Sequence, residues 1–258
     1  IVQENNLFMM EDTCESLGTR YEGKHLGTFG NFGTYSFYYS HHITTIEGGM
    51  VVTDNDQDFE LLKCLRAHGW TRYLENRNEL KEKFNELDDR FLFVNMGYNL
   101  RPMETQGAMG LIQLGKLEEK NIARNYNFNN VKKALMSDSR NGSLENGIRY
   151  LSMPTAMDNT EVAWFCIPIF ICKEELYTNY LEHLTECSIE NRPVVTGNMA
   201  KQPVFREMGL DINTDLPGAN VIHSRGFFIG ASCIKMSDDN INNLVNILLD
   251  YDFKKLYV

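Results

Sequence analysis

The sequence contains few cysteines for its length, and their spacing does not suggest a metal site. Its 258 residues include six cysteines, and no two of them form a C-x-x-C pair. Zinc and iron–sulfur sites commonly use such pairs, and a chain of this length rarely depends on a disulfide framework. We therefore expect mostly buried free thiols, no bound metal and a cytoplasmic location.

The sequence also lacks an excess of positive charge and any long apolar run. Its formal net charge is −10 and its pI is about 5.1, so it has no basic field to attract a nucleic acid or an anionic membrane surface. A membrane-spanning helix needs about 20 consecutive, mostly apolar residues, and no stretch approaches that length. We expect neither a nucleic acid nor a membrane as a partner.

The first residues lack the features of a targeting segment. The start, "IVQENNLFMMED", has no charged n-region followed by an apolar h-region. It has no initial Met, and it looks like a helix end that runs directly into an apolar strand. We therefore expect the chain to begin inside a domain.

Short strand-like runs alternate with helical patterns along the chain. Residues 7–12, 33–39 and 48–54 are apolar, aromatic or β-branched runs bounded by Gly, Asn or Asp, which is typical of strands. The longest helical pattern extends from Pro102 to about Leu135, and residues 161–172 form a later strand pattern. This alternation predicts an α/β fold.

Asp12 and a histidine pair stand out as residues that could carry chemistry. Asp12 follows the first predicted strand, where open α/β sheets place their ligands, although an aspartate there is more often a helix cap. His41 and His42 follow the second strand, and adjacent side chains on extended backbone point in opposite directions. Histidine suits proton transfer near neutral pH, but such a pair is more often at the surface or in the core.

Four sequence blocks, taken together, decide between these alternatives. In chain order they are "EDTCESLG", "GTFGNFGTYSFYYSHHITTIEGGMVVTD", "LRAHGWTR" and "GYNLRPMETQGAMGLIQLGKLEE". Their order and spacing over residues 5–125 resemble the DegT/DnrJ/EryC1/StrS family of sugar aminotransferases. A looser resemblance continues through "NRPVVTGNMAKQP" and "HSRGFFIG".

The resemblance implies an aspartate aminotransferase-like fold of type I that binds pyridoxal 5′-phosphate (PLP). Residues 1–125 would be part of the PLP-binding large domain, and residues 126–258 a smaller C-terminal α+β domain. The family pattern places Asp12 at the pyridine nitrogen, where a carboxylate keeps the ring protonated and electron-accepting. It also implies that Glu15 faces the same ring.

Two further cofactor contacts follow from the same resemblance. Ser36 would hydrogen-bond the phosphate of PLP. Asn99 resembles a residue that reaches this phosphate from a neighbouring subunit, which implies a homodimer.

The residue that most family members use to bind PLP covalently is absent. Five residues after the phosphate-binding serine they carry a lysine that forms a Schiff base, and here that position is His41. No lysine lies between Lys24 and Lys63, so a shift of one residue cannot restore it. Histidine cannot form a stable Schiff base, but it can transfer protons.

With a histidine at this position, the sequence resembles a subgroup of the family, the 3-dehydratases of nucleotide-linked 4-keto-6-deoxyhexoses. These enzymes act in deoxysugar and lipopolysaccharide O-antigen biosynthesis. In the implied reaction, pyridoxamine 5′-phosphate condenses with the sugar C4 ketone, His41 transfers a proton at the cofactor, and the C3 hydroxyl group leaves. His42 is expected to be structural.

Members of this subgroup differ in how the reaction ends. The ascarylose-type enzyme holds a [2Fe-2S] cluster through a cysteine-rich insert, whereas this sequence has no cysteine between Cys64 and Cys166. Without thiolates there to bind iron, we expect no iron–sulfur cluster. The colitose-type course is favoured, in which glutamate is the amino donor and ammonia is released. Candidates for substrate or cofactor contacts are His68, Arg72 and Arg101.

Two other interpretations remain open from the sequence alone. An ordinary sugar-nucleotide aminotransferase would have the same fold, but the absent lysine makes that chemistry awkward. A catalytically silent relative could serve as a binding or dimerisation module. The family's N-terminal portion, which supplies a backbone phosphate site and an aromatic ring stacked on the cofactor, has no counterpart before Ile1.

Overall fold

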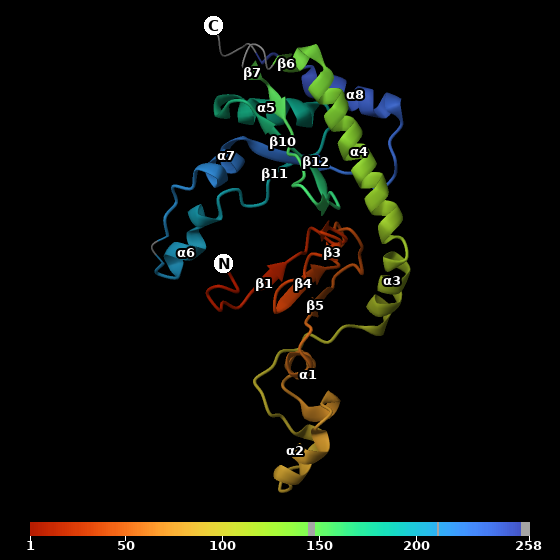
Figure 1. Cartoon of the computed structure of the whole chain (residues 1–258), viewed down its shortest axis with the longest axis vertical. Helices are drawn as coiled ribbons and strands as arrows, with labels where there is room; N and C mark the ends of the chain where they lie inside the picture. Colours follow the sequence, from red (N-terminus) through yellow and green to blue (C-terminus); the bar gives the residue numbers. More distant parts are fainter. Residues whose placement is uncertain (144–147, 211, 254–258) are drawn as a thin grey trace. The chain divides into compact units, whose positions relative to one another are not determined.

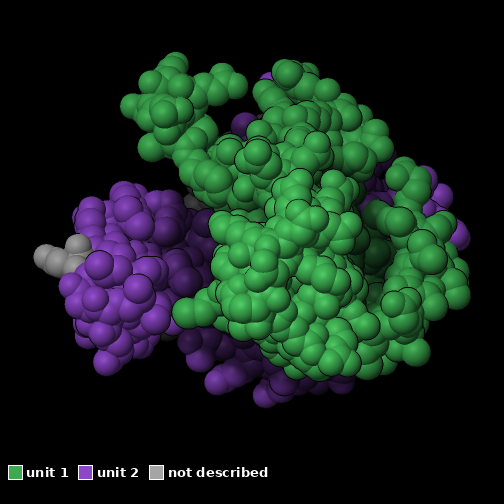
Figure 2. All heavy atoms as spheres, turned by 90° about the horizontal axis from the view of Figure 1, so that it is seen from below, with its two compact units in different colours: residues 1–118, 159–161 green, residues 119–158, 162–258 purple. Residues whose placement is uncertain are grey.

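The chain folds into two compact units, each with its own β-sheet (Figure 2). The computed structural model describes residues 1–143, 148–210 and 212–253. Unit 1 comprises Ile1–Glu118 with Asn159–Glu161, and unit 2 comprises Glu119–Asp158 with Val162–Val258. The predicted α/β class is confirmed. None of the helices in the described ranges combines the length and apolar character that a membrane crossing requires.

The central sheet of unit 1 has three strands, each shorter than the sequence pattern predicts. They are β1 (Met10–Asp12), β4 (Phe32–Ser36) and β5 (Gly49–Val52), in the order β1-β4-β5 (Figure 1). β1 runs parallel to β4, and β5 is antiparallel to β4. The parallel pairing brings the carboxyl ends of β1 and β4 to the same edge of the sheet.

The side chain of Glu11 holds the loop that enters β4. Its carboxylate accepts hydrogen bonds from the backbone N–H groups of Gly27, at 2.7 Å, Phe29, at 2.6 Å, and Gly30, at 2.7 Å. Hydrogen bonds to an ionised acceptor are roughly twice as strong as neutral ones. Because the loop is attached to β1 in this way, the register of β1 against β4 is fixed, and Glu11 lies opposite Gly33.

Two glycines allow this loop to lie against β4. Gly27 has a φ of +91°, and a Cβ at Gly33 would stand 1.9 Å from the carbonyl oxygen of Gly27. Only a residue without a side chain permits so close an approach of two backbone segments. A second small sheet, with the order β3-β2-β9, is formed by β2 (Arg20–Tyr21), β3 (Lys24–His25) and β9 (Thr160–Glu161).

Helical segments follow β5 in unit 1. Helix α1 (Asp56–Leu65) begins at Asn55, whose side chain accepts a hydrogen bond from the N–H of Asp58, as an N-cap residue should. Then come η1 (Thr71–Tyr73), α2 (Arg77–Lys83), η2 (Asp89–Phe91) and α3 (Glu104–Leu114). Gln106 of α3 donates a hydrogen bond to the carbonyl oxygen of Glu47 at 2.6 Å, which links α3 to the loop before β5.

Unit 2 is built on a four-stranded antiparallel sheet. Its order is β11 (Asn191–Pro193), β12 (Gly226–Gly230), β10 (Cys166–Ile171) and β8 (Leu151–Ser152). Burial alternates along β10, so one face carries Ile167, Ile169 and Ile171 into the core, as expected for a sheet with one covered face. A short hairpin, β6 (Gly142–Ser143) with β7 (Ile148–Arg149), lies elsewhere in the unit.

Three helices contribute further side chains to this core. They are α4 (Leu117–Ser137), α5 (Tyr177–Glu186) and α8 (Asp238–Leu249), and they contribute fully buried side chains such as Val131, Tyr180 and Leu248. The hydroxyl group of Tyr180 is satisfied by the carbonyl oxygen of Leu248 at 2.8 Å. The remaining segments are η3 (Ser139–Asn141), η5 (Glu174–Leu176), η6 (Met199–Lys201), α6 (Pro203–Glu207) and α7 (Pro217–Arg225).

Two predictions about secondary structure were wrong in detail. The single helix predicted over Pro102–Leu135 is two helices, α3 and α4, with Gly115 as the C-cap residue of α3. Glycine is a weak helix former, so a break at this position is unsurprising.

The strand predicted over residues 161–172 is split into β9 and β10. Side chains of α4 take the backbone groups that a continuous strand would use. Asn125 accepts from the N–H of Trp164, and Arg124 donates to the carbonyl oxygen of Phe165.

The cysteines also differ from expectation. All six are free, but only Cys64 is buried, and Cys233 is exposed.

Replacing Glu11 by glutamine should destabilise unit 1. Glutamine keeps one acceptor oxygen and places an NH₂ donor against at least one of the three N–H groups. We expect Glu11→Gln to lower the free energy of unfolding by about 2 kcal/mol, within the range of about 1.5–3 kcal/mol for hydrogen bonds to a charged group. Chemical denaturation measures this change, and faster amide hydrogen exchange at Gly27, Phe29 and Gly30 should accompany it.

A matched control is Glu22→Gln, which removes the same charge at an exposed turn residue. It should change stability by less than about 0.5 kcal/mol. Equal effects of the two substitutions would contradict the assigned role of Glu11.

Candidate active site

Asp12 is the last residue of β1, and its carboxylate organises the turn that follows. Its Oδ1 accepts a hydrogen bond from the N–H of Cys14 at 3.2 Å and another from the hydroxyl group of Thr34 at 3.4 Å. The alternative that Asp12 caps a helix is wrong, because a turn rather than a helix follows β1. The side chain is exposed, and a carboxylate can accept about four hydrogen bonds. Asp12 can therefore accept a further donor.

The surroundings of Asp12 favour its ionised form. Hydrogen bonds from Cys14 lower the pKa of the Asp12 carboxyl group below its usual value, and the hydrogen bond from the Thr34 hydroxyl group and the electrostatic interaction with His41 act in the same direction. Partial burial opposes these effects but does not cancel them. Asp12 is therefore a carboxylate at neutral pH.

The side chain of Ser36 lies on the same face of the sheet as that of Thr34, which contacts Asp12. Asp12 lies opposite Thr34 in the parallel pair, and Ser36 comes two residues later on β4. Side chains two residues apart on a strand point to the same face, and Thr34 already contacts Asp12 from that face. Ser36 Oγ accepts a hydrogen bond from the N–H of Tyr38 at 3.2 Å, so its O–H remains a possible donor to a ligand.

His41 belongs to a loop that is closed at its base by Phe37. The carbonyl oxygen of Phe37 accepts from the N–H of Thr45 at 2.9 Å, and its N–H donates to the carbonyl oxygen of Gly48 at 2.9 Å. Inside the loop, His42 is 1% exposed and Ile43 is 3% exposed. The loop is thus anchored in unit 1 by the two buried residues that follow His41.

Two contacts position His41 itself. Its N–H donates to the carbonyl oxygen of Tyr38 at 3.1 Å, which makes a turn. The Tyr38 ring meets the imidazole edge to face, with 5.7 Å between the ring centroids and an angle of 81°. His41 is half-buried, whereas His42 is buried. The burial of His42 agrees with a structural role for that residue.

Glu15 lies in the turn after β1 and is exposed. The N–H of Ser16 donates to the carbonyl oxygen of Thr13, so this segment turns sharply instead of continuing as a helix. Glu15 therefore lies in a turn, three residues after Asp12.

A second group of predicted residues lies at the end of α1. Ala67 forms a β-bridge with Asn99, and the N–H of His68 donates to the carbonyl oxygen of Tyr98 at 2.8 Å. The guanidinium group of Arg101 donates to Asn99 Oδ1 at 3.4 Å from both Nε and an Nη atom. Because Oδ1 faces Arg101, the amide N–H groups of exposed Asn99 point the other way.

Arg72 lies on an aromatic stack near this second group. Its guanidinium carbon is 4.9 Å from the centre of the Trp70 ring, and Trp70 stacks with Phe91 and with Phe93. Arg72 is exposed. Stacking on an aromatic face leaves the edge N–H groups of arginine able to bind an anion.

The predicted site residues therefore form two groups within unit 1. Asp12, Ser36 and His41 come together at the carboxyl ends of β1 and β4. His68, Asn99 and Arg101 come together at the end of α1, which Figure 1 shows outside the three-stranded sheet.

Two residues of the first group were missed from the sequence. Thr34 bonds Asp12 and Tyr38 contacts His41. The position of Thr34, two residues before Ser36 on one strand, was a signal that could have identified it. In the described part of the chain, no group of three or more His, Cys, Asp or Glu side chains could hold a metal ion.

Comparison with known proteins identifies relatives with similar sequence and fold. GDP-4-keto-6-deoxy-D-mannose 3-dehydratase of Yersinia pseudotuberculosis is 36% identical, over 96% of this chain and 61% of that protein. The structure of the E. coli GDP-4-keto-6-deoxy-D-mannose-3-dehydratase with bound hydrated PLP is 33% identical, with a TM-score of 0.82, over 96% of this chain and 61% of that one.

A further structure of a GDP-4-keto-6-deoxymannose-3-dehydratase contains a trapped PLP–glutamate geminal diamine. It is 32% identical to this chain, with a TM-score of 0.82, and the alignment covers 96% of this chain and 62% of that one. The chain thus spans about three fifths of the length of these relatives.

These similarities confirm the predicted fold, that of the PLP-dependent aminotransferases. Residues 1–249 match one family as a whole, and this range includes every sequence block on which the resemblance was based. The chain therefore belongs to the DegT/DnrJ/EryC1/StrS aminotransferase family.

Proposed function

We propose that the protein is a PLP/pyridoxamine phosphate-dependent 3-dehydratase of a nucleotide-linked 4-keto-6-deoxyhexose. The observation that supports this most strongly is the combination of His41, at the position of the family's lysine, with an ionised carboxylate at Asp12. The relatives named as 3-dehydratases, one of them with bound hydrated PLP, support the same conclusion.

The chemistry of the first group of residues fits this cofactor. An aspartate kept ionised by its neighbours suits a protonated pyridine nitrogen, and the serine hydroxyl on the same face of the sheet suits a phosphate. In this proposal Asp12 and Ser36 hold the ring and the phosphate, and Glu15 lies beside the ring. Asn99 binds the phosphate from the second subunit of a homodimer, which agrees with its exposed position at the end of α1.

His41 is the proton-transfer residue of the proposed reaction. When bound, pyridoxamine phosphate would link its amino group to the sugar C4 ketone and accept electrons into its ring, so that the C3 hydroxyl can leave as water. His41 removes the proton from the C4′ carbon of the cofactor, and Tyr38 limits the rotation of its imidazole ring. Because histidine cannot form a stable Schiff base, it does not retain the cofactor covalently.

Glutamate is the proposed amino donor that regenerates pyridoxamine phosphate, and hydrolysis releases ammonia with the 3-deoxy ketosugar. The relative with a trapped PLP–glutamate adduct supports this choice. The proposed course uses no iron–sulfur cluster.

His68, Arg72 and Arg101 are proposed to contact the substrate or the cofactor. Guanidinium groups match diphosphates well. The relatives act on a GDP-linked sugar, which makes GDP-4-keto-6-deoxymannose the first substrate to test. A cytoplasmic enzyme of deoxysugar biosynthesis would have access to such substrates.

The proposed reaction should be visible directly by mass spectrometry. Incubation of the whole protein with PLP, glutamate and a panel of nucleotide-linked 4-keto-6-deoxyhexoses should give a product that has lost the C3 oxygen and retains no amine. A stable amino sugar as the product would instead identify an aminotransferase. A covalent pyridoxyl adduct on a lysine of the wild-type protein after borohydride reduction would have the same meaning.

Substitution of His41 should remove the dehydration without removing the cofactor. We expect His41→Asn to lower the rate by roughly 10²- to 10⁴-fold, the usual contribution of a general base, while pyridoxamine phosphate binding, followed by absorbance, stays within about threefold. His41→Lys should move the product toward the amino sugar and allow borohydride to trap a pyridoxyl group at position 41. An unchanged rate in His41→Asn would exclude His41 as the base.

Substitution of Asp12 should change both the pH dependence of stability and the rate of dehydration. Because the pKa of Asp12 is lowered in the folded protein, its ionised form stabilises the fold above the usual carboxyl pKa, and this contribution is lost as the pH falls. The stability difference between wild type and Asp12→Asn should therefore be largest near pH 7 and shrink as the pH falls toward about 3.

The rate of dehydration should also fall in Asp12→Asn, by about 10²-fold or more, the usual cost of removing one electrostatic group. A stability difference that does not depend on pH would contradict the assigned ionisation of Asp12.

A further inference from the structure

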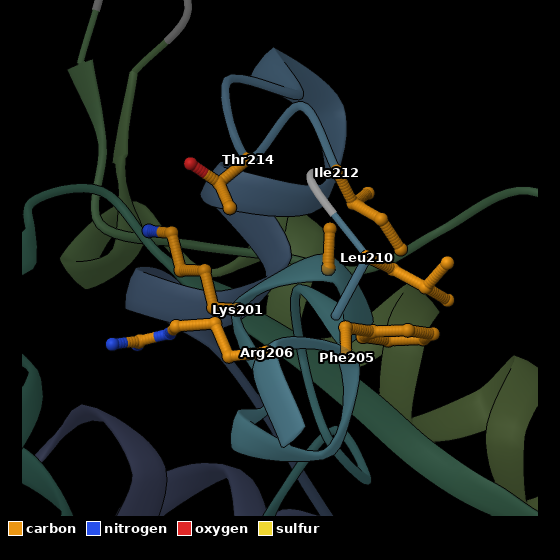
Figure 3. A pocket seen from close by; sticks show the side chains of 7 residues that line it. Lys201, Phe205, Arg206, Leu210, Ile212 and Thr214 are labelled. Atoms are coloured by element: carbon orange, nitrogen blue, oxygen red, sulfur yellow. The ribbon is translucent and has the colours of Figure 1, made fainter. Parts of the chain in front are cut away.

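Unit 2 contains a pocket that the proposed reaction does not use. It has a volume of about 450 Å³ and lies between η6, α6 and the segment that follows α6 (Figure 3). Small-molecule sites commonly have volumes between about 300 and 1,000 Å³. Its walls include Lys201, Phe205, Arg206, Leu210, Ile212 and Thr214.

The apolar wall of the pocket is built by the way α6 ends. Gly209 has a φ of +70°, its N–H donates to the carbonyl oxygen of Arg206, and the N–H of Leu210 donates to that of Phe205, both at 2.9 Å. These two bonds define a Schellman motif, in which the residue after the glycine contacts the residue five positions before it. The motif therefore places Leu210 beside Phe205.

A buried asparagine fixes the opposite wall. Asn198 is 0% exposed, and its Oδ1 accepts from the N–H of Ala200 at 3.1 Å. Its Nδ2 donates to the carbonyl oxygen of Thr214 at 3.0 Å and to Asn220 Oδ1 at 2.8 Å. One side chain thus holds η6, the Thr214 segment and α7 together, so the pocket is a defined feature of the fold.

The polar groups of the pocket lie on one side. Figure 3 shows the nitrogen atoms of Lys201 and Arg206 and the hydroxyl group of Thr214 pointing the same way, with Phe205, Leu210 and Ile212 toward the other side. Among the carboxylates that the structure describes, none forms an ion pair with either cation. In a chain with a net charge of −10, two cations side by side next to an apolar wall favour an anionic ligand.

We propose that this pocket binds a nucleoside diphosphate. Lys201 and Arg206 bind the phosphates, Thr214 donates a further hydrogen bond, and the base packs on Phe205 and Leu210. Guanidinium and ammonium groups are the usual phosphate ligands, and a base stacks well on an aromatic ring. The choice of a nucleoside diphosphate over other amphipathic anions rests on the proposed function, whose substrate carries one.

Isothermal titration of the whole protein with GDP, dTDP, CDP and UDP tests this site. Pyrophosphate and guanosine, as separate probes, distinguish the two parts of the ligand. We expect at least one nucleoside diphosphate to bind more tightly than either probe alone. The double variant Lys201→Gln/Arg206→Gln should weaken it by about tenfold or more, since two charge-assisted contacts are lost. Phe205→Leu should weaken nucleoside diphosphate binding and leave pyrophosphate binding unchanged.

Two double variants with the same loss of charge serve as comparisons. Lys133→Gln/Arg192→Gln removes two exposed cations of unit 2 and should change the affinity by less than about twofold. Arg72→Gln/Arg101→Gln removes two arginines of unit 1, the one stacked on Trp70 and the one in the second residue group. If only this last variant weakens nucleotide binding, the pocket assignment is wrong.

Other outcomes also decide the question. The proposal is overturned if no nucleoside diphosphate binds, if pyrophosphate binds as tightly as the best of them, or if Lys201→Gln/Arg206→Gln behaves like Lys133→Gln/Arg192→Gln. Failure of the proposed function gives a different result. A protein that neither binds PLP nor catalyses dehydration would still bind nucleotide through Lys201 and Arg206. Conversely, suppose that the wild-type protein catalyses dehydration and Lys201→Gln/Arg206→Gln binds nucleotide with unaltered affinity. The pocket assignment is then wrong, and the proposed function stands.

Discussion

The three hydrogen bonds that Glu11 accepts are the contact on which the candidate active site depends. They attach the loop of residues 27–30 to β1, and this loop leads directly into β4. The parallel register that results sets Asp12 opposite Thr34 and brings Ser36 to the same face. Glu11 and Asp12 are neighbours on β1, so their side chains point to opposite faces of the sheet. Glu11 anchors the loop on one face, and Asp12 belongs to the candidate site on the other.

The first group of site residues could be predicted from the sequence because its members are linked by local patterns. Asp12 follows a short strand, Ser36 ends another, and His41 occupies a position defined by its distance from Ser36. The role of Glu11 could not be predicted in this way. Its partners lie 16 to 19 residues later in the chain, and nothing in the spacing indicates that three N–H groups of one loop will face one carboxylate.

Long-range side-chain contacts also explain the errors in secondary structure. The pattern over residues 161–172 is a good strand, but Asn125 and Arg124 bind the backbone of Trp164 and Phe165 and divide it. In the same way, Asn99 and Arg101 reach the end of α1 through a bridge to Ala67 that no local pattern reveals. Strand and helix propensity is a weak guide wherever a distant polar side chain competes for the backbone.

The loop closed by Phe37 has a consequence for how new activities can arise on this fold. The buried residues that hold the loop are His42, Ile43 and Thr45, whereas His41 is half-buried, makes a turn with Tyr38 and packs on its ring. The side chain at position 41 is thus less buried than the neighbouring side chains that hold the loop. Under the proposed function, the residue that sets the reaction class and the residues that hold the loop are therefore different ones, so the two can change separately in evolution.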